Sequence, residues 1–215
     1  MVFDSSTWKR DLLTNRETIR LYNTKQEVCR EDYEVVDTIL QKAVFYSAFI
    51  IRKLIECQIK TSDEVDKYLL TVKRYKALKQ FVPTYHWTDE KSHDWEHPAS
   101  EQRKGYEICN WLIHSFFFEF LYNEKTKVID GFYVASDYDR NKDLYFVQFN
   151  DWLVYMDFVA NDVIVDFNVQ YGLKNGERVI VSMKKTRGDM SLGLLENARL
   201  LADSKKNSEN EEGKK

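Results

Sequence analysis

The sequence predicts an α+β fold, with an N-terminal antiparallel helical bundle followed by a small antiparallel β-sheet and a C-terminal helix. Two observations predict it. Apolar residues recur at helical intervals through most of residues 1–123, whereas β-rich segments separated by turn-type residues occupy residues 127–185. We expect residues 1–123 to form the bundle, residues 124–203 to form a β subdomain whose helix packs on it, and residues 204–215 to be a disordered tail.

The composition limits the function classes. Of the 215 residues, 43 % are hydrophobic and 14 % are aromatic, so a sizeable core can form. The net charge of −3 argues against a protein that binds polyanions over its whole surface. The 32 Lys and Arg residues can still form a local basic face, and we expect no cofactor.

Cysteine usage and the apolar runs indicate the compartment. Cys29, Cys57 and Cys109 are widely spaced and form no Cys-x-x-Cys pair, which favours a reducing interior over a disulfide framework. Residues 1–13 lack the apolar core of a signal peptide, and the longest apolar runs, such as residues 43–51, are too short to span a bilayer. We therefore expect a soluble cytoplasmic protein that does not enter a membrane.

The N-terminal half carries most of the helical signal. Residues 5–23 open with cap-type residues and continue with apolar residues at roughly helical intervals, which predicts a first helix. Residues 30–60 show a broad apolar stripe and predict a long helix that packs in an antiparallel bundle. A capping-box pattern at residues 61–64 predicts a short helix, followed by a strand at residues 68–75.

The middle of the chain changes character twice. Residues 79–98 are polar and aromatic and contain both prolines, so we expect them to be irregular. Residues 99–123 are apolar on most helical faces, which predicts the buried helix of the bundle.

The C-terminal half follows the two-residue period of strands, with turn signals at residues 138–141 and 174–177. The expected elements are strands at 127–137 and 142–150, a short helix at 151–159, hairpin strands at 163–171 and 178–185, and a last helix at 191–205.

The segment HDWEHP places His93, Glu96 and His97 in the H-x-x-E-H spacing of a family of zinc peptidases. Such a site needs both histidines on one face of a stable helix and a third ligand. Pro98 follows at once, and the residues before it offer no apolar face that would anchor a helix. We expect an exposed polar loop whose tryptophans pack against the bundle, with His93 and His97 kept as an alternative metal site.

Those tryptophans are Trp87 and Trp95, and His86 is the nearest further candidate ligand. Asp89, Glu90 and Asp94 could add oxygen donors, but such residues are ordinary on a protein surface.

The fourth histidine, His114, lies in the most apolar predicted helix. At 100° per residue, Arg103, Glu107, Asn110 and His114 fall on one narrow polar stripe. Burying such a row without partners costs roughly 1–3 kcal/mol per unsatisfied group, so the stripe needs partners, water or a substrate.

Arg52 and Glu56, one turn apart on the second helix, are candidate partners. If they face the third helix, they form a polar pocket in a helical core with Asn110 and His114. A histidine passes protons near pH 7, and an arginine holds a phosphate. This set suffices for metal-free RNA cleavage, for phosphate binding, or for a structural polar network, and the residues leave these alternatives open.

The stretches FIIRKLIE (49–56) and ICNWLIHSFFF (108–118) resemble the HEPN superfamily, the higher eukaryotes and prokaryotes nucleotide-binding domains. The resemblance covers roughly residues 30–122. It implies a helical bundle and a homodimer whose two motifs form one cleft. It also implies a metal-independent ribonuclease of toxin–antitoxin, CRISPR or abortive-infection systems.

The family signature is an arginine, a polar residue after it, and a histidine four to six residues on. In this chain His114 matches the histidine and Asn110 the polar residue, but Cys109 stands in the place of the arginine. A cysteine cannot hold a phosphate as a guanidinium does, and Arg103 lies roughly 16 Å from His114 along a helix. Arg52, from the neighbouring helix, is the better substitute.

The resemblance thus implies His114 as acid and base and Asn110 as an orienting group, with Arg52 and Glu56 completing the site and Arg103 binding substrate. Two alternatives remain: a non-catalytic nucleotide-binding module, and an interaction protein that binds a partner in a prokaryotic complex through its aromatic surface.

Overall fold

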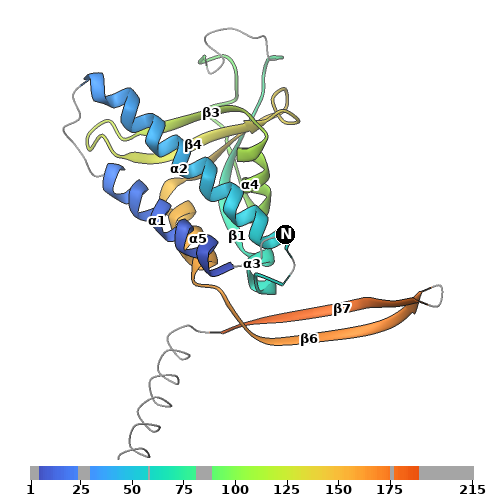
Figure 1. The fold of residues 1–215 in the computed structure, drawn as a ribbon. Coiled ribbons are helices and arrows are strands. Elements are labelled where there is room, and N and C mark those ends of the chain that lie inside the picture. The colour runs from blue at the N-terminus through green and yellow to red at the C-terminus, as the bar shows by residue number, and fades with distance from the viewer. Residues whose placement is uncertain (1–4, 24–29, 58, 81–88, 175–176, 189–215) are drawn as a thin grey trace, which may run out of the picture.

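The structure is a computed structural model that describes residues 5–23, 30–57, 59–80, 89–174 and 177–188. It has two parts, a body built on a five-stranded sheet and a two-stranded arm that projects from it (Figure 1).

The sheet of the body is antiparallel at every pairing, in the order β2-β1-β5-β4-β3. Its residue pattern explains why one face is buried. Phe118 of β3, Phe132 of β4 and Val147 of β5 lie on the face that meets the helices. The strands are β1 (Leu69–Lys76), β2 (Ala99–Lys104), β3 (Ser115–Tyr122), β4 (Ile129–Ser136) and β5 (Asp143–Gln148).

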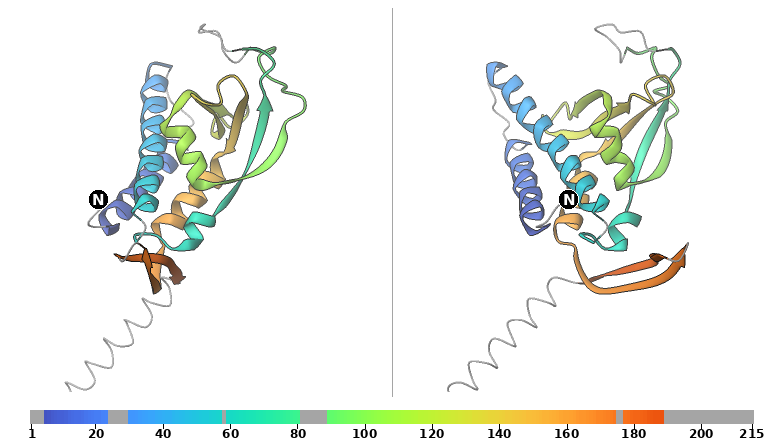
Figure 2. Two further views of the ribbon diagram at one scale, coloured as in Figure 1. Left: turned by 90° about the vertical axis from the view of Figure 1, so that its right-hand side faces the viewer. Right: turned by 45° about the vertical axis from the view of Figure 1, so that its right-hand side comes forward.

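Helices cover this one face in two tiers (Figure 2). The helices α4 and α5 contact the sheet, and α1 packs on α2 and α5. The helix α2 packs on α4 and also reaches β3, where the ring centroids of Phe45 and Phe118 lie 4.9 Å apart. Trp152 and Tyr155 of α5 are fully buried at the centre of the core. The helices are α1 (Ser5–Asn23), α2 (Arg30–Glu56), α3 (Asp63–Lys67), α4 (Gly105–Ile113) and α5 (Phe149–Ala160).

The arm consists of β6 (Val163–Lys174) and β7 (Glu177–Gly188), paired only with each other among the described strands. Two cations fix its base to the body. Lys185 lies 3.6 Å from Asp63 on α3, and Arg187 lies over the ring of Phe158 at 3.5 Å.

The predicted fold class is wrong. The sequence predicted an N-terminal helical bundle followed by a small sheet, but helices and strands alternate, and β1, β2 and β3 join β4 and β5 in one sheet. The predicted domain boundary after residue 123 therefore falls between two paired strands, β3 and β4.

The error lies in residues 99–123, which form β2, α4 and β3 instead of one buried helix. The segment SFFFEFLY (115–122) is rich in aromatic residues, which favour strands, and a strand can bury the apolar residues of one face against helices. The helix between the strands is nine residues long, from Gly105 to Ile113.

The structure confirms several other predicted elements within a few residues. The first helix has the predicted bounds, the second ends at Glu56, and the short helix follows at Asp63–Lys67. The predicted strand near residues 68–75 is β1, and the C-terminal hairpin is β6 and β7. The predicted last helix at 191–205 and the tail lie outside the described residues.

In the part of the chain that the structure describes, no helix combines the length and the hydrophobicity needed to cross a membrane.

Close approach of α4 to α5 makes one glycine a test of this fold. A Cβ at Gly105 would collide with the ring of Tyr155, whose side chain is fully buried and cannot turn away. We predict that Gly105→Ala lowers the free energy of unfolding by about 1–3 kcal/mol, measured by urea denaturation.

Gly172→Ala is the matched control. A Cβ at Gly172 meets only the exposed side chain of Val181, at 2.7 Å, so this side chain can move and the loss should stay below about 0.5 kcal/mol. Equal losses in the two variants would contradict the packing of α4 on α5.

Candidate functional site

The helix α4 positions the predicted catalytic histidine. Its buried face carries Ile108, Cys109 and Leu112, none of which is exposed, and Trp111 stacks on Tyr145 of β5 with ring centroids 3.9 Å apart. His114 ends the helix as its C-cap, where the backbone N–H of His114 donates to the carbonyl oxygen of Asn110 at 3.0 Å. The imidazole therefore stands where the chain turns from α4 into β3.

Arg52 of α2 reaches this histidine. Its Nη1 lies 3.0 Å from Nε2 of His114. Since a guanidinium only donates hydrogen bonds, Nε2 must accept, so the ring in this contact is neutral and carries its proton on Nδ1. The two residues are 62 positions apart in the sequence, and the packing of α2 on α4 brings them together.

Two neighbours hold the guanidinium in place. Arg52 Nε donates to Oε1 of Glu56 at 2.7 Å, and Lys53 Nζ donates to Oε2 of the same carboxylate at 2.9 Å. The hydrogen bond to Glu56 raises the pKa of Arg52, with a smaller contribution from Tyr106. The hydrogen bonds from Lys53 and Arg52 lower the pKa of Glu56. Both members of the pair thus stay charged at neutral pH.

The predicted location of this cluster is wrong. The sequence placed Arg52, Glu56, Asn110 and His114 in a pocket inside a helical core, but the imidazole is exposed, and 24 % of the Arg52 and 32 % of the Glu56 side chain is accessible. The reason is that α4 ends at Ile113, so His114 lies at the helix end rather than in the middle of a long buried helix. A substrate can reach the cluster from solvent.

Asn110 contributes an unsatisfied acceptor. Its side-chain Oδ1 is buried and has no hydrogen-bond partner within the described part of the chain. A buried acceptor without a partner costs roughly 1–3 kcal/mol, which a donor on a bound molecule would recover.

Cys109, at the place of the signature arginine, does not face the surface. Its thiol is fully buried, and burial raises its pKa well above the usual range. The positive charge of Arg52 acts on the pKa of the same thiol in the opposite direction, with a smaller effect than burial.

The other members of the predicted stripe lie elsewhere. Arg103 belongs to β2, where Nη2 lies 2.6 Å from Glu101 and the guanidinium lies over the ring of Tyr145 at 5.8 Å. Glu107 accepts from the backbone N–H of Lys104 at 3.0 Å and caps the start of α4. Arg103 lies apart from His114 because it precedes α4, whereas Glu107 shares α4 with His114 but caps the start of that helix.

The H-x-x-E-H loop is more ordered than the sequence predicted. His93 is 2 % exposed, forms an isolated β-bridge with Ala77, and contacts Trp95 edge to face at 5.4 Å. Burial lowers the pKa of His93, which favours the neutral ring. The expectation of an exposed loop is therefore wrong for His93, although His97 is exposed and lies 3.0 Å from Asp94.

No group of three or more potential metal ligands occurs among the residues that the structure describes. His86 and Trp87 lie outside the described residues.

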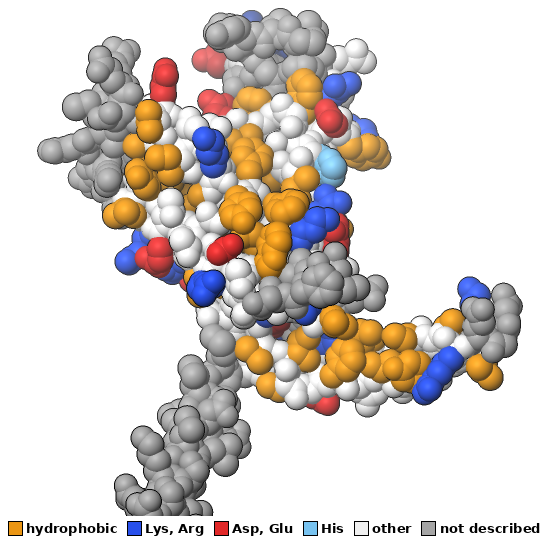
Figure 3. All heavy atoms as spheres, in the orientation of Figure 1, with side chains coloured by type: hydrophobic (Ala, Val, Ile, Leu, Met, Phe, Trp, Pro, Cys, Tyr) orange, Lys and Arg blue, Asp and Glu red, His pale blue; other side chains and the backbone are white. Residues whose placement is uncertain are grey.

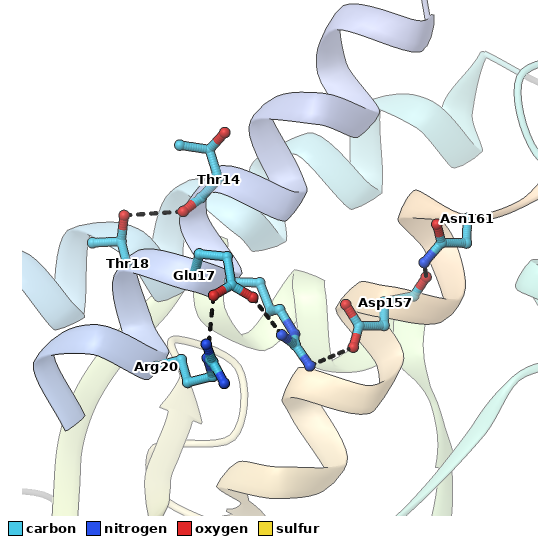
Figure 4. Close-up of polar contacts among 7 residues, drawn as sticks. Thr14, Glu17, Thr18, Arg20, Asp157 and Asn161 are labelled. Carbon is cyan, nitrogen blue, oxygen red and sulfur yellow. Dashed lines mark hydrogen bonds and ion pairs between the residues drawn. The ribbon is translucent and has the colours of Figure 1, made fainter. Parts of the chain in front are cut away.

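A second polar cluster joins α1 to α5 (Figure 4). Arg16 lies 2.8 Å from Asp157 and 2.5 Å from Glu17, and Glu17 also pairs with Arg20 at 3.1 Å. A surface pocket of about 550 Å³ borders Glu17 and Arg20. These groups pair with one another and form a structural bridge between the two helices, although Arg16 Nε is buried without a hydrogen-bond partner in the described part of the chain.

Sequence reasoning missed two residues of the candidate site, Lys53 and Tyr106. The spacing of Lys53, three residues before Glu56, was a usable signal. Tyr106 lies four residues before Asn110, and both fall inside the predicted helix as well as inside α4, so this spacing was a usable signal too.

No family model, no curated protein and no solved structure matches the chain.

The tautomer of His114 gives a direct test of the site geometry. We predict that the neutral ring carries its proton on Nδ1, read from long-range ¹H–¹⁵N correlations, because Nε2 accepts from Arg52. Arg52→Met should shift the ring toward the Nε2–H form. His97, 3.0 Å from Asp94 through its Nδ1, is the internal control and should not change. An Nε2–H ring in the unaltered protein would contradict the contact.

Proposed function

We propose that the protein is a metal-independent ribonuclease that binds an RNA phosphate at Arg52 and uses His114 to move the proton. The observation that carries this proposal is the 3.0 Å contact between Arg52 Nη1 and His114 Nε2 on an accessible surface. We extend it to the setting that the sequence resemblance implies, a cytoplasmic component of a prokaryotic defence or toxin–antitoxin system. The helical bundle of that family is not part of the proposal.

The guanidinium supports phosphate binding. It has five N–H donors in a rigid fork, and its contacts with Glu56, His114 and Tyr106 leave donors for phosphate oxygens. The ammonium group of Lys53 stands on the same helix with 43 % of its side chain exposed, which adds positive charge beside the site.

The imidazole supports proton transfer. A phosphate that takes the Nη1 donor of Arg52 releases Nε2 of His114, which can then accept the proton of the 2′-hydroxyl. The 2′-oxygen bonds to phosphorus, and the bond from phosphorus to the 5′-oxygen breaks. The protonated His114 gives its proton to that oxygen, so the products are a 2′,3′-cyclic phosphate and a 5′-hydroxyl. Arg52 balances the charge that builds on the phosphate.

A non-catalytic nucleotide- or RNA-binding module is the second candidate. Two observations favour it. The hydrogen bond from Arg52 takes up the Nε2 lone pair that His114 would need to act as a base, and Cys109 stands in place of the signature arginine. Such a module would use the same cations, Arg52 and Lys53, and would leave the RNA intact.

Cleavage of single-stranded RNA in the presence of EDTA separates these functions. We predict that the unaltered protein cleaves and leaves 2′,3′-cyclic phosphate ends. His114→Ala should lower the rate by about 10²- to 10⁴-fold because it removes the proton acceptor. Its melting temperature should barely move, since the side chain is exposed.

His97→Ala is the matched control, because His97 is also exposed and pairs with a carboxylate, but lies outside the site. It should cleave like the unaltered protein. RNA binding without cleavage, weakened by Arg52→Met, would overturn the ribonuclease in favour of the binding module. Neither binding nor cleavage would overturn both.

A further inference from the structure

A pocket lies where α1, the end of α5 and the start of the arm meet. Its volume is about 470 Å³, a size typical of small-molecule sites, and its lining comes from three places in the sequence. Lys9 and Arg10 belong to the N-terminal part of α1, and Lys60 follows the end of α2. The arm, along which hydrophobic side chains are visible in Figure 3, leaves the body beside this pocket at Val163.

The charged residues of the lining are mostly basic. Of the described residues that line the pocket, three are cations and one is an acid, namely Lys9, Arg10, Lys60 and Asp162. The carboxylate of Asp162 is fully buried and already accepts two hydrogen bonds from Ser62, from the backbone N–H at 2.8 Å and from the hydroxyl at 2.5 Å. One carboxylate balances one cation, so the lining keeps an excess of two positive charges.

A fourth cation adds to this excess. Arg187 Nε lies 3.9 Å from Oδ1 of Asp162, and Lys9 Nζ lies 4.0 Å from Oδ2 of the same carboxylate. Burial lowers the pKa of Lys9, the charge of Asp162 raises it, and the charges of Arg187 and Lys60 lower it again. Like charges around one partly buried lysine are costly to hold together, and a bound anion offsets that cost.

Nearby acids outside the lining do not cancel the excess. Asp157 on α5 lies 2.8 Å from Arg16, and Asp63 on α3 lies 3.6 Å from Lys185. Both carboxylates therefore already have a cation of their own. Asp11, which follows Arg10 in the sequence, does not line the pocket.

The remaining wall is largely apolar, with Leu13, Ile59, Ala160 and Val163 among its residues. Ile59 is 54 % exposed and Val163 is 37 % exposed, so a ligand can reach both side chains. The pocket thus suits a molecule that joins an anionic group to an apolar one. A phosphate monoester carries about −1.5 to −2 at pH 7, which matches an excess of two positive charges better than the single charge of a carboxylate does.

We propose that this pocket binds a small organic phosphate monoester, with the phosphate at Lys9, Arg10 and Lys60 and an apolar group against Ile59 and Val163. A guanidinium holds phosphate oxygens through a fork of N–H donors, and the two lysines add compact positive charges. The apolar group gains from leaving water, so the phosphate alone binds more weakly than the whole ligand.

The pocket is separate from the candidate ribonuclease site, since neither Arg52 nor His114 lines it, and either proposal can hold without the other. Its walls come from α1, from the end of α5 and from the start of β6, so a bound ligand bridges the body and the base of the arm. A ligand that binds only the folded chain also raises the melting temperature.

Isothermal titration calorimetry of the full chain with phenyl phosphate tests the site. Phenyl phosphate carries both groups and should bind about tenfold tighter than inorganic phosphate or benzoate, which each lack one property of the ligand. Arg10→Gln and Lys60→Gln should each weaken its binding about tenfold, because each removes a charged donor. Arg20→Gln is the matched control, since Arg20 is an exposed cation of the same helix outside this pocket, and it should bind like the unaltered protein.

The site of binding can be read from ¹H–¹⁵N spectra, in which phenyl phosphate should shift the amides of Lys9, Asn161 and Val163. Four outcomes would overturn the proposal. They are no binding of phenyl phosphate, equal affinity for benzoate, and undiminished binding by a folded double variant that carries Arg10→Gln and Lys60→Gln. The fourth is binding only to phosphatidylcholine vesicles that contain phosphatidic acid, which would make the ligand a lipid headgroup.

Discussion

The burial of one face of α4 is the constraint on which the candidate site depends. Ile108, Cys109 and Leu112 are fully buried between α2 and the sheet, so α4 cannot roll without exposing them. The last turn of the helix must then deliver His114 to the surface beside Arg52. Because the carboxylate of Glu56 holds the guanidinium from the other side, the imidazole meets a donor whose position is already fixed. The site is therefore a product of helix packing rather than of a local motif.

Part of this site could be predicted from the sequence. A single histidine in an apolar segment and an Arg–Glu pair one turn apart were enough to indicate a contact between Arg52 and His114, and the structure brings the two together. Whether the site is buried or exposed could not be predicted. Residues 99–123 are apolar enough to form either one buried helix or a strand, a short helix and a second strand. The two arrangements differ in the pairing of β3 with β4, which is not a local contact. Arg103 was misplaced for the same reason.

For the arm, the secondary structure could be predicted from the sequence, but what its apolar side chains pack against could not. Alternation of apolar and polar residues predicted the hairpin, since the period of a strand is local. The same alternation arises whether the apolar side chains pack on the body of the chain or on another molecule, so it carried no information about what they contact. Leu173 and its neighbours on the arm are exposed, so these side chains do not pack on the described body of the chain. The body thus carries the small polar site, whereas the arm exposes apolar side chains.

The coupling between Arg52 and His114 in RNA binding tests the central claim most directly. The measurement is a double-mutant cycle with Arg52→Met and His114→Gln, using the affinity for a 2′-O-methyl oligonucleotide that cannot be cleaved. A shared phosphate site predicts a coupling energy of about 0.5–3 kcal/mol, because each side chain positions the other. Losses that add within about 0.3 kcal/mol, or affinities unchanged by either substitution, would contradict it.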